Sequence, residues 1–103
     1  MEQILTLSKI LELLERNRDK VNLYGVKNIG VFGSYAKKNQ ISSSDIDFIV
    51  EFKEGEKNFD NYMGLKILLE DLFQLKIDLV IKENIKPALK QNILSSVVYA
   101  QGI

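Results

Sequence analysis

Two linked segments lie in the middle of the chain, VFGSYA at residues 31–36 and SDIDFIV at residues 44–50. The first continues an apolar run, Lys27–Phe32, which lies between two glycines and predicts a buried strand. Its Gly-Ser pair is expected to open a short helical turn, followed by a polar loop. In the second, apolar and acidic residues alternate, which predicts a strand over Asp45–Phe52. The central pattern is therefore strand, short helical turn, loop and strand.

Three aspartates occupy strand positions where a structural residue would be apolar. Asp45 and Asp47 are two residues apart, so a strand points both side chains to one face. Their repulsion and desolvation would be relieved by a divalent cation such as Mg²⁺, which prefers oxygen ligands. Asp78 interrupts a third expected strand, Lys76–Ile81, and completes a carboxylate triad if that strand lies beside the second one. Taken singly, Asp45 also fits a turn or cap, and Asp78 also fits a solvent-facing position on an edge strand.

The Gly33-Ser34 pair supplies features that suit an anion. Glycine lets a phosphate approach the backbone closely, and the serine hydroxyl and the N–H groups of a following turn bind anions. A plain strand-to-helix turn with Ser34 as the N-cap explains the pair equally well by itself. Together, an anion-binding turn and cation-binding carboxylates form the two halves of a site for a nucleoside triphosphate with Mg²⁺.

Amphipathic helices are expected on both sides of these strands. The first has apolar residues at helical spacing, including Ile4, Leu7, Leu11 and Leu14. A second is expected over Asp60–Phe73, and a last one enters at Pro87 and ends before Gly102. Their apolar stripes are expected to be core, with partner docking as the alternative. The order predicts an α/β (α+β) fold, a small mixed three- to four-stranded sheet flanked by helices, as one domain over residues 1–103.

Composition excludes several kinds of chemistry. The 103 residues include no His and no Cys, which excludes Ser-His-Asp triads, thiolate zinc sites and disulfides. Any reaction must use carboxylates, Lys or Arg, hydroxyls and a borrowed metal ion. Fourteen basic residues balance fourteen acidic ones, so no direct nucleic-acid binding is expected. Met1–Gln3 lacks a basic leader and no membrane span is visible, so we expect a cytoplasmic protein.

Gly33-Ser34, ten further residues and Asp45-Ile46-Asp47 form a pattern that resembles the polymerase-beta-like nucleotidyltransferase superfamily. The segments at residues 31–36 and 44–50 are similar to its minimal nucleotidyltransferases. The third carboxylate of that family is expected in an Asp-Leu-Val context, which Asp78 provides. The resemblance extends over nearly the whole chain and implies the polymerase-beta-like nucleotidyltransferase fold.

The resemblance also implies an activity. Minimal nucleotidyltransferases of this size commonly act as antitoxins that move AMP from ATP to a tyrosine of a HEPN-domain ribonuclease toxin. On this hypothesis Gly33 and Ser34 bind the β- and γ-phosphates. Asp45 and Asp47 bind Mg²⁺ on the triphosphate, and Asp78 shares a second Mg²⁺ and accepts the proton of the incoming hydroxyl.

One departure from the family concerns the residues after the Gly-Ser pair. Family members often continue with Arg-Gly where this chain has Lys37-Lys38. Lysine keeps the charge but loses the planar fork that binds phosphate bidentately. Lys37 is the candidate nucleotide-binding residue, and either it or Lys38 contacts the triphosphate loosely or both are solvated.

Two other functions remain open. The chain could transfer a nucleotide to a small molecule or to an RNA end. The absence of an expected second domain and the neutral net charge argue against both acceptors. The chain could also be a non-catalytic antitoxin that blocks its toxin sterically, although such a protein has no reason to keep three carboxylates on its sheet.

Overall fold

Ten elements follow one another along residues 5–41 and 43–103, the parts of the chain that the computed structural model describes. The helices are α1 (Leu7–Arg16), α2 (Arg18–Asn22), α3 (Gly33–Ala36), α4 (Phe59–Phe73), the 3₁₀ turn η1 (Lys82–Asn84) and α5 (Pro87–Leu94). The strands are β1 (Val26–Phe32), β2 (Ile46–Phe52), β3 (Ile77–Ile81) and β4 (Val98–Tyr99). Met1–Gln3 and Ile4, which entered the predictions above, lie outside the described residues.

The four strands form one mixed sheet in the order β3-β2-β1-β4. β1 pairs antiparallel with β2 and β4, whereas β2 and β3 are parallel because α4 crosses over between them. The predicted mixed sheet is therefore confirmed, and it has the larger of the two expected strand numbers. β3 is an edge strand, and it lies directly beside β2, as the proposed carboxylate triad requires.

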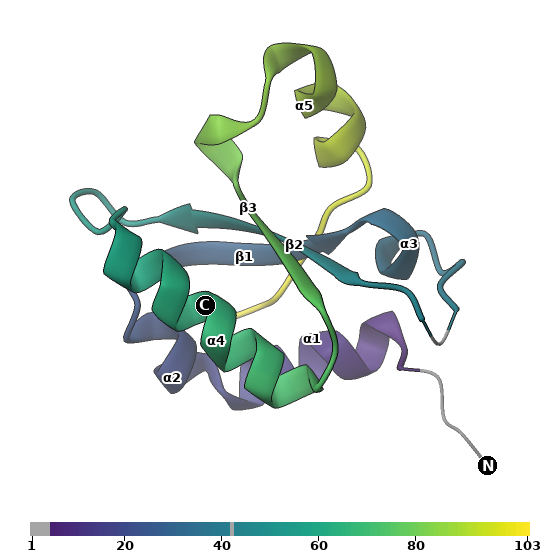
Figure 1. Ribbon diagram of the computed structural model, residues 1–103, viewed down its shortest axis with the longest axis horizontal. Coiled ribbons are helices and arrows are strands. Elements are labelled where there is room, and N and C mark those ends of the chain that lie inside the picture. The colour runs from purple at the N-terminus through teal and green to yellow at the C-terminus, as the bar shows by residue number, and fades with distance from the viewer. Residues whose placement is uncertain (1–4, 42) are drawn as a thin grey trace.

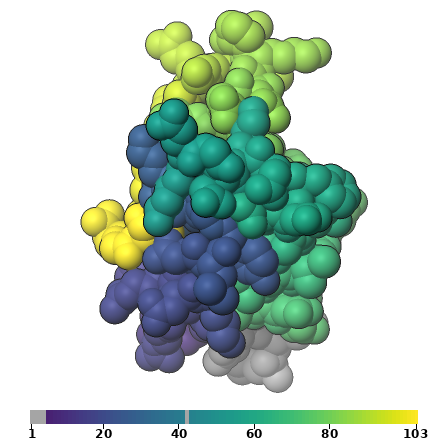
Figure 2. All heavy atoms as spheres, turned by 90° about the vertical axis from the view of Figure 1, so that its left-hand side faces the viewer, coloured from purple at the N-terminus to yellow at the C-terminus, as the bar shows by residue number. Residues whose placement is uncertain are grey.

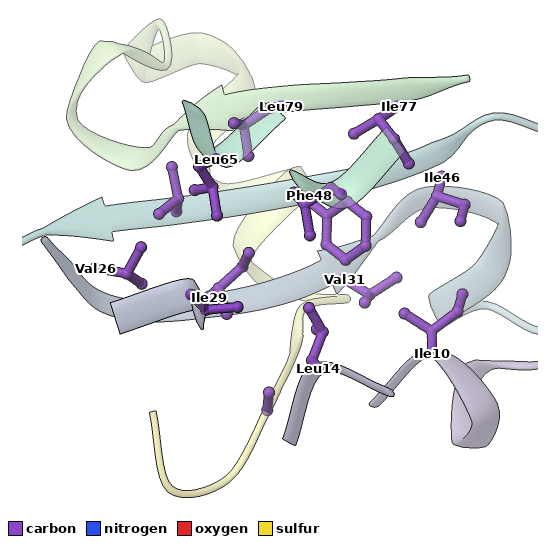
Figure 3. Packing of buried hydrophobic residues seen from close by; sticks show 14 of the residues in the cluster. Ile10, Leu14, Val26, Ile29, Val31, Ile46, Phe48, Leu65, Ile77 and Leu79 are labelled. Carbon is purple, nitrogen blue, oxygen red and sulfur yellow. The ribbon is translucent and has the colours of Figure 1, made fainter. Parts of the chain in front are cut away.

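One face of the sheet is covered by helices, and the core lies between them. Figure 1 shows α1, α2 and α4 on the same side of β1 and β2. The spacing of their apolar residues explains this, since α1 buries Ile10 and Leu14 while α4 buries Leu65, Leu69 and Phe73. Figure 3 shows Ile10, Leu14 and Leu65 among apolar side chains of the strands, and Leu69 and Phe73 belong to the same buried cluster. The expectation that the apolar stripes of these helices are core is confirmed.

The last part of the chain differs from the prediction. A helix was expected from Pro87 to just before Gly102, but α5 ends at Leu94 and β4 follows it. β-branched and aromatic residues at 97–99 favour a strand, and the free edge of β1 supplies the pairing partner. Edge pairing therefore overrides the helical spacing of the apolar residues.

The opposite face of the sheet carries α5 rather than a packed helical layer. Figure 1 shows α5 on the side of β1 and β2 away from α1, α2 and α4. In Figure 2 the same segment forms a knob at the top of the molecule. None of the helices in the described ranges is long and apolar enough to cross a membrane.

Candidate functional site

The strand register places Asp47 and Asp78 side by side. They are direct partners in the parallel pair of β2 and β3. Ile46 and Phe48, the neighbours of Asp47 along β2, are buried in the core. Because side chains alternate across a strand, Asp47 and Asp78 point to the other face, on which α5 lies. Asp45 directly precedes β2 and is exposed. The condition under which the sequence places Asp78 beside Asp47, adjacent second and third strands, is met by this register.

The Gly33 turn lies against the same carboxylate. Phe32, the last residue of β1, pairs with Asp47, so α3 begins beside it. Gly33 has φ +71°, a left-handed conformation that residues with a Cβ avoid. A Cβ at this position would also overlap the Asp47 carboxylate. Only glycine therefore fits here, for a conformational reason and a steric one.

The electrostatics of Asp47 show the repulsion that the sequence predicts. Burial raises the pKa of the Asp47 carboxyl above its ordinary value, and the negative charges of Asp78 and Asp45 raise it further. Asp47 is the half-buried member, whereas the other two are exposed. A cation beside Asp47 would offset the free-energy cost of keeping this carboxylate ionised. The electrostatics of the site therefore favour the binding of a positive ion.

The three aspartates do not form a closed ligand cage. Within residues 5–41 and 43–103, no three acidic side chains are close enough together to bind one metal ion as they stand. The donors nevertheless suit Mg²⁺, because all are carboxylates and this ion is commonly held by one or two of them with waters and substrate phosphates completing its shell. The Asp47–Asp78 pair, with Asp45 nearby, meets that requirement.

The remaining predicted nucleotide-binding residues lie on or just after α3. The N-cap of α3 is Phe32, so the alternative in which Ser34 caps this helix is wrong. Ser34 is instead in the first turn, where backbone N–H groups lack intrahelical partners. Lys37 is the C-cap, and both it and Lys38 are exposed. In the described part of the chain neither lysine forms an ion pair, and whether Lys37 binds nucleotide stays a prediction.

Tyr35 is a residue that sequence reasoning missed. Its side chain is 1% exposed, and its hydroxyl donates a hydrogen bond to the Ser44 carbonyl at 3.4 Å. This contact joins α3 to the residue directly before Asp45. Burial and the negative charge of Asp45 raise the pKa of the Tyr35 phenol. The sequence feature that could have indicated a buried role for Tyr35 is its position as an aromatic residue in an otherwise polar segment.

A second polar cluster lies farther along the same face. Glu51 accepts a hydrogen bond from Asn28 and forms ion pairs with Lys27 and Lys82 at 3.7 and 3.8 Å. The hydrogen bond and the two lysines lower the pKa of the Glu51 carboxyl. The charge of Glu51 is thus neutralised by its neighbours. By contrast, the charges that shift the pKa of Asp47 are those of two other carboxylates, Asp78 and Asp45. The comparison separates a satisfied structural carboxylate from one suited to bind a cation.

Both the sequence and the fold have known relatives. The sequence model of the nucleotidyltransferase domain family matches residues 8–100. The chain belongs to this family. As a nucleotidyltransferase it is 40% identical over 97 residues to a provisionally named protein adenylyltransferase of Methanocaldococcus jannaschii, MJ1379, covering 91% of this chain and 97% of that protein. It is 35% identical over 97 residues to the protein adenylyltransferase MntA of Thermococcus cleftensis, covering 93% and 97% respectively.

A solved structure has the same fold as this nucleotidyltransferase. A toxin–antitoxin structure with AMP-PNP superposes with a TM-score of 0.69 at 27% identity, covering 96% of this chain and 75% of that one. A structure provisionally named a minimal nucleotidyltransferase superposes with a TM-score of 0.70 at 30% identity, covering 85% of this chain and 93% of that one. Together with the family match, this confirms the expected minimal nucleotidyltransferase fold and nucleotidyltransferase chemistry.

Proposed function

We propose that this nucleotidyltransferase is the cytoplasmic antitoxin of a HEPN/MNT toxin–antitoxin pair and transfers AMP from ATP to a tyrosine of its toxin. The observation that carries the proposal is that two aspartates and a glycine turn lie together at one end of the sheet. Asp47 and Asp78 are register partners on one face, and the left-handed Gly33 turn lies against Asp47. Relatives named protein adenylyltransferases and the toxin–antitoxin structure with AMP-PNP support the acceptor class and the nucleotide.

The reaction assigns a role to each residue. The Gly33-Ser34 turn offers backbone N–H groups and a hydroxyl to the β- and γ-phosphates. The tyrosine oxygen attacks the α-phosphorus in line, and a new O–P bond forms as the bond to pyrophosphate breaks. Asp78, which is exposed and therefore accessible to an acceptor, takes the proton of the tyrosine hydroxyl. With no His in the chain, a carboxylate is the available base.

Mg²⁺ is the metal ion that the site would hold. Asp45 and Asp47 would bind it with the triphosphate, and Asp78 would share a second ion. An ion held there would neutralise phosphate charge and polarise the reacting oxygens. The carboxylates by themselves orient the acceptor and carry the charge that makes the site selective for a cation. Their repulsion, expressed in the raised pKa of Asp47, favours ion binding.

The openness of the carboxylate site supports a macromolecular acceptor. Asp45 and Asp78 are exposed, and the helical elements that Figure 1 shows away from the α1, α2 and α4 layer are the short α3, η1 and α5. A partner protein can supply the missing wall, which excludes water from the reacting groups. This reading favours a hetero-oligomer with the toxin over a small-molecule acceptor.

Label transfer tests the proposal. The chain is incubated with ATP labelled at the α-phosphate, Mg²⁺ and the product of the adjacent open reading frame. We expect label on a tyrosine of that product, located by mass spectrometry. Asp47→Asn is expected to lower the rate at least about 100-fold, because a preorganised charged group is lost. Glu51→Gln is the matched control, since it makes the same chemical change on the same face of β2 and should keep the activity.

Three outcomes separate the alternatives. Neutralisation of the toxin without label would leave the steric antitoxin as the explanation. Label on a serine or threonine would retain protein adenylyl transfer and reject tyrosine as the acceptor. Equal losses in Asp47→Asn and Glu51→Gln would contradict the role assigned to Asp47.

A further inference from the structure

Asp45 is held in the site differently from the other two aspartates. Asp47 and Asp78 lie inside β2 and β3, where paired residues on both sides of them fix the backbone. Asp45 directly precedes β2 and is exposed. Its position therefore depends on what fixes the end of the loop between α3 and β2. The last residue of that loop before Asp45 is Ser44.

Three hydrogen bonds within the described residues fasten Ser44. Its backbone N–H donates to the Ile41 carbonyl at 2.9 Å, and its hydroxyl accepts from the Ile41 N–H, also at 2.9 Å. These two bonds close a turn of the loop, but Ile41 is itself 63% exposed. In the third bond the Tyr35 hydroxyl donates to the Ser44 carbonyl at 3.4 Å. This bond ties the turn to the interior of the protein.

Tyr35 is a suitable anchor because its ring belongs to the buried apolar cluster. A phenylalanine would bury the same ring without desolvating a hydroxyl, so the polar atom is unfavourable unless it forms a hydrogen bond. Burial raises the pKa of the Tyr35 phenol, and the negative charge of Asp45 raises it further. The Asp45 carboxylate therefore lies close enough to the phenol to affect it.

The anchor and the glycine turn belong to one short helix. α3 spans Gly33–Ala36, and its first residue lies against the Asp47 carboxylate. Tyr35 follows Gly33 by two residues. The same four-residue helix thus touches Asp47 at its start and supports the residue before Asp45 from its third position. It links the positions of the phosphate-facing turn and both carboxylates of the β2 segment.

We infer that Tyr35 is a positioning residue, which holds the Asp45 carboxylate ready to bind a divalent cation through its bond to the Ser44 carbonyl. The inference rests on the proposed function, because that function assigns Asp45 to the ion on the triphosphate. It goes further by naming the contact that keeps this carboxylate in place. A ligand that is already oriented loses less conformational entropy when it binds an ion, so an exposed carboxylate outside the sheet gains from such support.

A matched pair of conservative variants tests the anchor. Tyr35→Phe removes the hydroxyl and leaves the ring in the core. Tyr62→Phe makes the same change, since the Tyr62 hydroxyl also donates to a backbone carbonyl, that of Leu79, at 2.6 Å. Leu79 lies inside β3, where strand pairing holds the neighbouring Asp78 without help from Tyr62. Binding of Mn²⁺, in place of Mg²⁺, is measured on the chain alone by electron paramagnetic resonance of the free ion.

We expect Tyr35→Phe to raise the Kd for Mn²⁺ about 10-fold, the low end of the range for residues that orient metal ligands, and Tyr62→Phe to leave it within about twofold. Thermal unfolding should show that both variants fold and that both lose stability, because each deprives a backbone carbonyl of its hydroxyl donor. An unchanged Kd in Tyr35→Phe, or an equal loss of affinity in Tyr62→Phe, would overturn the inference.

A double-mutant cycle tests whether Tyr35 acts through Asp45. Asp45→Asn alone should weaken Mn²⁺ binding, because a carboxylate ligand is lost. In that background Tyr35→Phe should change the Kd by less than about twofold, since both substitutions remove the same contribution. A further loss of about 10-fold in the double variant would show that Tyr35 does not act through Asp45 and would reject the inference.

Label transfer distinguishes this inference from the proposed function. Label transfer by wild type, with normal Mn²⁺ binding by Tyr35→Phe, would reject the positioning role and keep the enzyme. Weaker Mn²⁺ binding by Tyr35→Phe, without label transfer by wild type, would support the positioning role and reject adenylyl transfer. If both proposals hold, the label-transfer rate of Tyr35→Phe should recover at high Mg²⁺ concentration, because mass action compensates for weaker binding.

Discussion

The two faces of β2 differ although they alternate along a single strand. On the helix-covered face Ile46, Phe48 and Val50 are 0% exposed and belong to the core. On the α5 face Asp47 is only half-buried and carries a raised pKa. The first face gains stability from apolar burial, whereas the second keeps groups that repel one another. The second face is not wholly given to chemistry, because Ile49 on that face is only 1% exposed; the position of Asp47 is where β2 exchanges burial for a charged group.

The same division is visible in the helices. α1 and α4 are amphipathic and their apolar sides reach the core, so their sequence patterns report packing. α5 has comparable aliphatic residues but buries none of them. Apolar residues at helical spacing therefore indicate core packing on one side of this sheet but not on the other. The variants below test whether the two sides can be changed independently.

The largest effect is expected from Phe48→Ala on the core face. Phe48 is fully buried, and its ring lies 5.6 Å from that of Phe73. Truncation leaves a cavity and should reduce the free energy of unfolding by about 3–5 kcal/mol, measured by urea denaturation. Leu23→Ala is the control, since Leu23 is 78% exposed, and should change stability by less than about 0.5 kcal/mol. A small loss in Phe48→Ala would show that this face does not carry the stability.

An intermediate effect is expected from Gly33→Ala on the chemical face. The left-handed backbone costs about 1–2 kcal/mol for a residue with a Cβ, and the added methyl group must displace the Asp47 carboxylate. Both stability and label transfer should fall. Gly55→Ala is the matched control, because Gly55 also has a positive φ (80°) but no atom within 4 Å of an added Cβ. It should lose stability and keep the activity; equal losses of activity would contradict the role of Gly33.

The smallest effect is expected in the pH dependence of the stability, to which Asp47 contributes. Its folded-state pKa is raised above the ordinary 3.8. Stability associated with this group is therefore present below that value and is lost as the pH rises through the folded pKa. In metal-free buffer Asp47→Asn should be more stable than wild type at pH 7, and the difference should vanish below about pH 3.8. A variant that is less stable at pH 7 would show that the carboxylate has a favourable partner.

Much of the site could be predicted because its signals are local. The spacing of Asp45 and Asp47 fixes a common side of β2, and Gly33-Ser34 follows directly from the end of β1. The partnership of Asp78 with Asp47 needed the order of the strands, which the sequence indicated only through family resemblance. Tyr35 was missed because a buried phenol has no periodic pattern. The end of α5 was misplaced because the free edge of β1, a distant segment, competes for residues 98–99.

By itself, the sequence determined the reaction class: without His or Cys, and with a Gly-Ser turn ahead of paired aspartates, it favours metal-assisted transfer to or from a phosphate. It also determined the core faces of α1 and α4, because helical periodicity is a local property. Only the tertiary structure decided which carboxylates are neighbours, that Glu51 is neutralised while Asp47 is not, and that α5 has no fully buried side chain. These depend on strand register and layer order, which bring together residues far apart in the chain.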